Sequence, residues 1–142
     1  MNIRNTLVSI LFIGSLLSGT SAMAEHERCN VNRIKRLSQD LYYASNDFAD
    51  AVRYERGYDR LYQDILDLAL DFNYFNRSID RRSSCYDIRS DWDVINQRAL
   101  NFKRRWFRIH DRIGNRRMER EFDYVGNIYD TLSREVYYGG RR

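Results

Sequence analysis

The chain of 142 residues contains no proline and only seven glycines. Proline is the commonest interrupter of helices, and folds built from many short strands normally need frequent glycine and proline turns. Their scarcity favours long helices over a sandwich or barrel. Hydrophobic residues make up 43% of the chain, which is too many for intrinsic disorder, and the length suits one compact domain.

Residues that commonly carry catalysis or bind metals are also few. The only histidines are His26 and His110, and the only cysteines are Cys29 and Cys85, with no metal-ligand spacing among them. The C-x-x-C-H haem motif, the E-x-x-H pair of di-iron bundles and the G-x-S-x-G nucleophile motif are all missing. We therefore expect no enzyme activity, no metal, no cofactor and no small-molecule substrate.

Three aspartates are the nearest approach to a paired-carboxylate site. Asp64, Asp67 and Asp71 are spaced three and four residues apart, opposite apolar positions of the same segment. That spacing places them on one face of a helix, and a charged stripe of this kind is typical of a face in contact with solvent.

The first 24 residues have the pattern of a secretory signal peptide. Arg4 precedes an apolar run from Leu7 to Leu17, and small residues lead to Ala22 and Ala24. An uncleaved membrane anchor is the alternative, but spanning a bilayer takes about 20 apolar residues and this run is shorter. We expect cleavage after Ala24, a single domain over residues 25–142 with no stable membrane span, and a bacterial periplasmic or secreted location.

Apolar residues of the remaining chain recur at alternating steps of three and four, the spacing of one helix face. The pattern predicts helices over about 31–56, 59–77, 85–113 and 116–137. Short connections between them favour antiparallel neighbours, so we expect an all-α fold with an up-down-up-down four-helix bundle. The third segment has the most regular apolar face: Cys85, Ile88, Trp92, Ile95, Ala99, Phe102, Trp106, Ile109 and Ile113. Trp92 and Trp106 are therefore expected in the core.

Residues that commonly end or cap helices lie between the segments and agree with these limits. Gly57 and Gly114 follow the first and third segments, as glycine often does at helix ends. Asp59, Ser84 and Asn115 are side chains that can cap the helices that begin after them.

The apolar spacing can also be continued through Gly57, which would merge the first two segments into one long helix. The cysteines decide between these alternatives. An exported protein favours a disulfide between Cys29 and Cys85, which precede or open the first and third helices. These two helix starts lie at the same end of a four-helix bundle, but at opposite ends of a rod with a continuous first helix, too far apart to bond.

Charge is distributed unevenly along the chain, whose formal net charge is +4. Residues 40–71 carry eight acidic and three basic residues, whereas residues 98–120 carry nine basic and two acidic ones. Arginines at the start of the fourth helix oppose its dipole, which a purely structural role does not explain. The candidate anion-binding residues are Lys103, Arg104, Arg105, Arg108, Arg112, Arg116, Arg117 and Arg120.

A second set of apolar residues lies off the core face of the third helix. Val94, Leu100 and Phe107 are expected to point outward beside arginines, a combination typical of protein interfaces. Cover by a neighbouring helix or by the carboxyl-terminal tail is the alternative.

Two functional hypotheses follow. The first is a non-enzymatic periplasmic bundle that binds another protein or itself, as a chaperone, adaptor, inhibitor or envelope-complex subunit. The second is a binder of an anionic envelope polymer, such as lipopolysaccharide or peptidoglycan, or of nucleic acid, through the basic segment 98–120.

Overall fold

The computed structural model describes residues 29–82 and 84–139, which form four α-helices, one short 3-10 turn and no strand. The helices are α2 (Val31–Tyr54), α3 (Tyr62–Ile79), α4 (Cys85–Ile113) and α5 (Arg116–Tyr138), and the turn η1 (Asp59–Leu61) precedes α3. The predicted all-helical class is confirmed. The predicted signal peptide, residues 1–24, lies outside the described residues.

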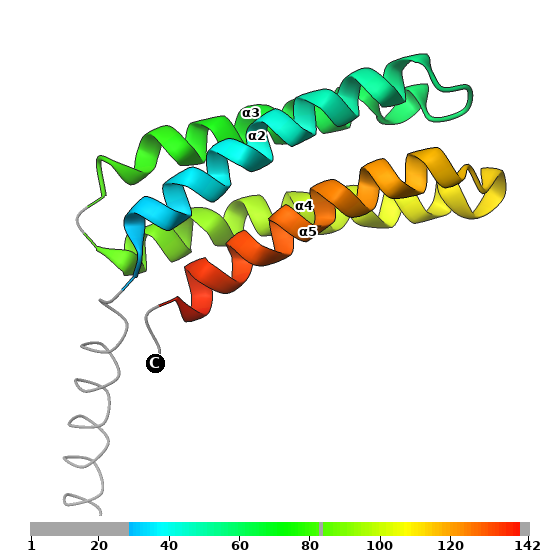
Figure 1. The fold of residues 1–142 in the computed structure, drawn as a ribbon. Coiled ribbons are helices and arrows are strands. Elements are labelled where there is room, and N and C mark those ends of the chain that lie inside the picture. Colours follow the sequence, from blue (N-terminus) through cyan, green and yellow to red (C-terminus); the bar gives the residue numbers. More distant parts are fainter. Residues whose placement is uncertain (1–28, 83, 140–142) are drawn as a thin grey trace, which may run out of the picture.

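The helices are arranged as two hairpins packed face to face (Figure 1). α2 and α3 make the first hairpin, and α4 and α5 make the second. α2 also packs along α5, and α3 packs along α4, so that the four helices enclose a common core. The starts of α2 and α4 lie at the same end of the molecule (Figure 1).

The break between α2 and α3 is sharper than the sequence pattern indicates. α2 ends at Tyr54, two residues before its predicted limit, because Glu55 adopts extended backbone angles and Gly57 has a φ of +88°. No side chain in the described part of the chain caps the start of η1 or of α3. The expected capping by Asp59 is wrong, because Asp59 is itself part of η1.

In the second hairpin, both helices begin after the predicted capping residues, and α4 ends at the predicted glycine. The Ser84 hydroxyl accepts a hydrogen bond from the Asp87 backbone N–H at the start of α4. Gly114 ends this helix in the left-handed conformation, with a φ of +67°. The Asn115 side chain then accepts from the N–H groups of Arg117 and Met118, which satisfies two free donors at the start of α5.

Cys29 and Cys85 lie at disulfide distance, with their Sγ atoms 2.00 Å apart and their Cα atoms 5.9 Å apart. The bond joins the residue before α2 to the first residue of α4, across 56 positions of sequence. This is the pair expected from the same-end placement of the two helix starts.

Two tryptophans from α4 anchor the core. Trp92 is 0% exposed and Trp106 is 1% exposed, as predicted. Trp106 stacks on Phe122 of α5, with ring centroids 4.5 Å apart, and Trp92 packs against Phe75 of α3 at 5.0 Å. Burial of large aromatic side chains dominates the energy of such cores.

The ends and the middle of the predicted apolar faces depart from the expected burial. Ile113 is 43% exposed at the tip of α4. Steps of three and four along the first segment place Ala51 on its apolar face, but Ala51 is only partly covered and Val52 is fully buried instead. The same spacing along the fourth segment includes Val125 and Tyr129, which are half-buried because α5 stands away from α4 there.

Candidate functional site

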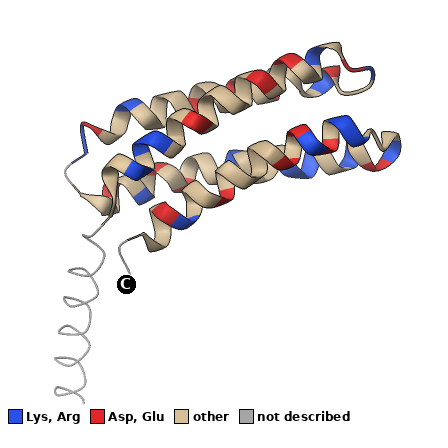
Figure 2. Ribbon diagram, viewed as in Figure 1, with Lys and Arg blue, Asp and Glu red and all other residues tan. Residues whose placement is uncertain are grey.

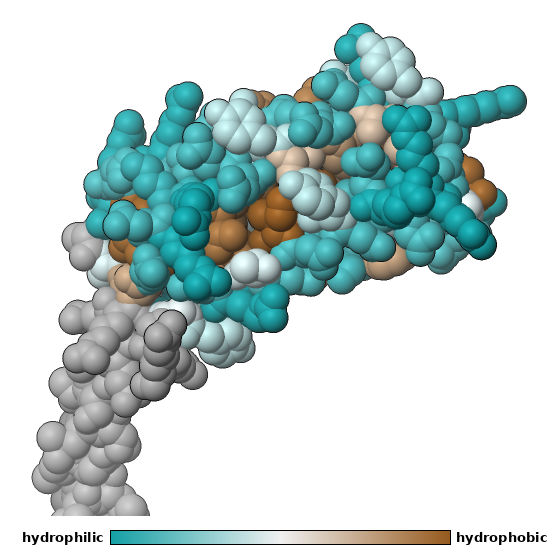
Figure 3. All heavy atoms as spheres, in the orientation of Figure 1, coloured by the Kyte–Doolittle hydropathy of each residue, from teal (hydrophilic) through white to brown (hydrophobic). Residues whose placement is uncertain are grey.

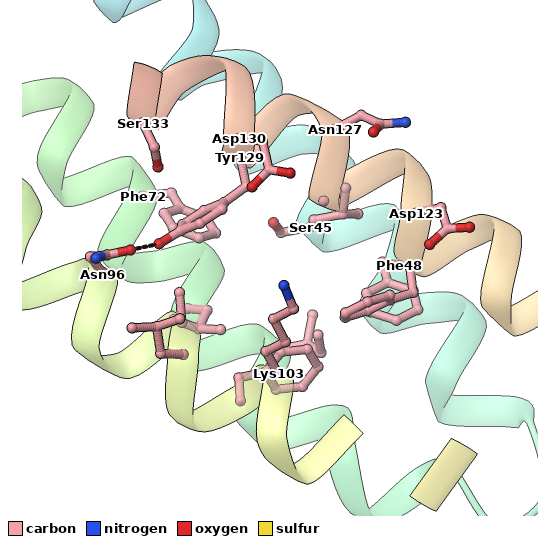
Figure 4. Close-up of a pocket in the computed structure, with 18 of the residues that line it drawn as sticks. Ser45, Phe48, Phe72, Asn96, Lys103, Asp123, Asn127, Tyr129, Asp130 and Ser133 are labelled. Atoms are coloured by element: carbon pink, nitrogen blue, oxygen red, sulfur yellow. Dashed lines mark hydrogen bonds between the residues drawn. The ribbon is translucent and has the colours of Figure 1, made fainter. Parts of the chain in front are cut away.

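A cleft separates the middle of α4 from the middle of α5. This pair makes less contact than the α2–α3, α2–α5 and α3–α4 pairs. The cleft has a volume of about 500 Å³, and its lining includes residues of all four described helices. Apolar side chains make up most of the interior: Phe48 of α2, Leu68 and Phe72 of α3, Phe102 of α4, and Phe122 and Val125 of α5 (Figure 4). We call this feature the α4–α5 cleft.

The rim of the α4–α5 cleft carries polar groups at one end. The Tyr129 hydroxyl donates a hydrogen bond to Oδ1 of Asn96, across the gap between α5 and α4 (Figure 4). Burial raises the pKa of Tyr129 to about 12. Burial, followed by the hydrogen bond to Asp93, raises the pKa of Tyr137 as well. Both phenols are therefore neutral donors at physiological pH.

Leu100 and Phe107, two of the three residues predicted to face a partner, line the rim of the α4–α5 cleft. Leu100 is 40% exposed and Phe107 is 43% exposed. Phe107 also packs edge-on against Phe122, with centroids 5.8 Å apart. Val94 is 60% exposed but borders a shallow hollow between α3 and α4, so the structure does not bring it together with the other two.

The predicted anion-binding residues divide into three groups. Lys103 lines the α4–α5 cleft, and Arg105 pairs with Asp64 of α3 at 2.6 Å. The other six arginines are exposed, and none of them is in an ion pair with a described residue. They gather at the tip of the α4–α5 hairpin (Figure 2). We call this group the basic end; it comprises Arg104, Arg108, Arg112, Arg116, Arg117 and Arg120.

Some basic residues outside the basic end form ion pairs with acidic residues of neighbouring helices. Arg98 of α4 contacts both oxygens of Asp71 in α3 at 2.8 Å, and Arg33 of α2 pairs with Glu135 of α5 at 3.2 Å. Asp64 and Asp71, expected on a solvated face, thus link α3 to α4. The acidic side chains in these ion pairs all lie outside the basic segment 98–120. Within that segment, Asp111 and Glu119 are the acidic residues.

Hydrophobic residues are also visible between the two hairpins on the face seen in Figure 3. They form a brown crease between hydrophilic residues of the upper and lower helices.

No group of three or more His, Cys, Asp or Glu side chains suited to a metal ion occurs in residues 29–82 and 84–139. Within that part of the chain, no helix is both long and apolar enough to cross a membrane. His110 is half-buried, stacks on Trp106 and shares a hydrogen bond with Tyr58.

In comparisons with known proteins, no family model, no curated protein and no solved structure matches this chain.

Sequence reasoning missed Ser45 and Gly126, which both line the α4–α5 cleft. Signals for them exist in the sequence. Ser45 follows Ser38 by seven residues among the apolar positions of α2, and Gly126 interrupts the middle of the fourth apolar pattern. A polar residue and a glycine at such positions are departures from the helical pattern that call for a reason.

Proposed function

We propose that this protein is an exported, non-enzymatic binding protein that contacts an acidic partner protein through the basic end and the adjoining rim residues Leu100 and Phe107. The observation that carries the proposal is the stripe along α4 in which exposed apolar residues alternate with arginines that have no ion pair to a described residue. Arg104 lies one turn from both Leu100 and Phe107, and Arg108 and Arg112 continue the stripe toward the hairpin tip.

The combination of arginines with exposed apolar residues favours a protein over a polymer as the partner. Arginine and aromatic residues are enriched at protein interfaces, where arginine makes paired hydrogen bonds to carboxylates. A polyanion binds mainly through charge and gives little role to an exposed phenylalanine. An anionic envelope polymer is the second candidate, favoured by the six arginines of the basic end that have no ion pair with a described residue.

The compartment and the topology belong to the same proposal. A leader over residues 1–24, cleaved after Ala24, places the domain in the periplasm or outside the cell, and the Cys29–Cys85 pair suits an oxidising compartment. In the proposed up-down-up-down bundle, the α4–α5 hairpin presents the basic end at the tip opposite the disulfide (Figure 1, Figure 2).

Photo-crosslinking from inside the proposed interface tests the proposal. Benzoylphenylalanine replaces Phe107 in the exported protein, and a control protein carries it instead of Tyr74, which is 76% exposed on α3. We expect a discrete protein adduct from position 107, with an acidic partner, and none from position 74.

The same crosslinker at position 107 is then combined with Arg108→Gln and Arg112→Gln. We expect these changes to abolish the adduct, and added salt to weaken it, because screening acts on exposed charges. An adduct that forms equally from both positions, or that survives the arginine substitutions, contradicts the proposal. Retention on lipopolysaccharide or peptidoglycan that depends on the basic end, without a protein adduct, favours the second candidate.

A further inference from the structure

The α4–α5 cleft contains a buried polar group that no described residue satisfies. Ser45 of α2 is 2% exposed, and its hydroxyl has no hydrogen-bond partner among residues 29–82 and 84–139. In Figure 4 this hydroxyl points into the cleft. A buried polar atom without a partner destabilises the fold, so its presence beside the apolar interior of the cleft points to a ligand that supplies the missing hydrogen bond.

Ser38 shows that α2 can bury a serine without this cost. It lies seven residues before Ser45 and is 0% exposed. Its hydroxyl donates to the Lys35 carbonyl oxygen at 2.8 Å and accepts from the Asn76 side chain at 2.8 Å. The two serines occupy equivalent helix positions, and only the one that lines the cleft is left unsatisfied.

Gly126 keeps the opposite wall of the cleft open. It lies in the middle of α5, where glycine costs roughly 1 kcal/mol relative to alanine. Glycines inside helices often allow a close approach of another element, but a Cβ on Gly126 would meet no atom within 4 Å. The absent side chain therefore preserves space in the cleft instead of making room for a neighbouring helix.

Charge at the mouth of the cleft indicates the head group of the ligand. The Lys103 ammonium points into the cleft from α4, and it forms no ion pair with a described residue (Figure 4). Asp123 and Asp130 line the α5 side of the rim and are exposed. An anionic head group is attracted to Lys103 and repelled by the two aspartates, which fixes the side of the cleft on which it lies.

We propose that the α4–α5 cleft binds a monocarboxylate with an apolar chain, of the fatty-acid class, whose carboxylate lies between the Ser45 hydroxyl and the Lys103 ammonium. The chain of the ligand contacts the apolar lining formed by Phe48, Phe72 and Phe122. The cleft volume of about 500 Å³ lies within the range of small-molecule sites. This inference does not rest on the partner protein, although Leu100 and Phe107 of the proposed interface line the same cleft. It differs from the sequence-based expectation that the protein has no small-molecule substrate.

Calorimetric titration of the full exported chain with dodecanoate tests this inference, with Ser45→Ala and Ser38→Ala as a matched pair. We expect saturable binding of one dodecanoate per chain, weakened about tenfold or more by Ser45→Ala, because the lost hydrogen bond is made to a charged group. Ser38→Ala is expected to leave the affinity unchanged. Ser45→Ala is also expected to raise the melting temperature of the ligand-free protein, whereas Ser38→Ala lowers it.

A second set of variants separates the head group from the cavity. Lys103→Met is expected to weaken dodecanoate binding several-fold, and Arg104→Gln, its neighbour outside the cleft, is not. Gly126→Phe fills the cleft and is expected to abolish binding, while circular dichroism verifies its helices. Absence of saturable binding, equal losses from Ser38→Ala and Ser45→Ala, or tighter binding of dodecyltrimethylammonium than of dodecanoate overturns the proposal.

Discussion

The hydroxyl of Tyr58 lies 2.8 Å from Nδ1 of His110, which joins the α2–α3 connection to the last turn of α4. Tyr58 is 0% exposed, and its hydroxyl also accepts a hydrogen bond from the Asn115 backbone N–H at 3.4 Å. Burial raises the pKa of this phenol, so it is a neutral donor and acceptor at physiological pH. One side chain thus ties the tips of both hairpins together, directly beneath the basic end.

Replacing Tyr58 by phenylalanine removes this tie and leaves the aromatic ring. We expect the Tyr58→Phe variant to lose about 1–2 kcal/mol of unfolding free energy, because His110 and Asn115 each lose a partner in a partly buried place. Urea unfolding followed by circular dichroism measures the loss. A variant as stable as the parent protein would mean that solvent replaces the tyrosine hydroxyl at no cost.

Two glycines are expected to respond to alanine in opposite directions. Gly57 has a φ of +88°, so Gly57→Ala destabilises the protein through backbone strain. A Cβ there would lie 2.6 Å from Cδ1 of Ile113, but that side chain is 43% exposed and can move aside. Gly126 is helical with open space around its Cα, so Gly126→Ala stabilises it by about 0.5–1 kcal/mol. Melting temperatures of the two variants give the comparison, and shifts of the same sign contradict this reading of the two positions.

The disulfide is expected to contribute strongly to stability. Replacing Cys29 and Cys85 together by serine should cost roughly 2–5 kcal/mol, because the bond closes a loop across 56 positions of sequence. Thiol titration of the unfolded, unreduced protein should detect no free thiol. Two titratable thiols per chain would show that the bond does not form in the exported protein.

Tyr129 gives the fold a specific sensitivity to alkaline pH. Its pKa rises from an ordinary value of 10.0 to about 12 in the folded protein, chiefly through burial. The unfolded chain therefore loses the phenol proton first, and the stability present below pH 10 declines as the pH rises toward 12. Urea unfolding at about pH 9 and about pH 11 should show a larger loss for the parent protein than for Tyr129→Phe. Equal losses would contradict the raised pKa.

Periodicity predicts the elements of this fold well because each helix has to bury one stripe of its surface. Trp92 and Trp106 lie in the core for that reason, and the predicted limits of α4 agree with the structure. The α2–α3 break is less well predicted, because Glu55 and Gly57 set it by local backbone geometry rather than by apolar spacing.

The sites are harder to predict than the core, because helix spacing states which way a residue points but not how far apart two helices stand. Val125 and Tyr129 have the spacing of core residues, yet they border the α4–α5 cleft. Val94 and Leu100 both point away from the core, yet they lie on different sides of α4. Arg105 belongs by sequence to the basic segment, and only the structure shows that Asp64 neutralises it.

The most direct test of the proposed interface compares two triple variants with the same change in net charge. One replaces Arg108, Arg112 and Arg116 of the basic end by glutamine, and the other replaces Arg36, Arg77 and Arg81, which are exposed near the opposite end of the molecule. Affinity for the acidic protein crosslinked at position 107 is measured for both variants at two salt concentrations. We expect the first variant to lose binding and most of its salt dependence, and the second to bind as the parent protein does. Equal affinities of the two variants would contradict a specific role of the basic end and leave only a general effect of charge.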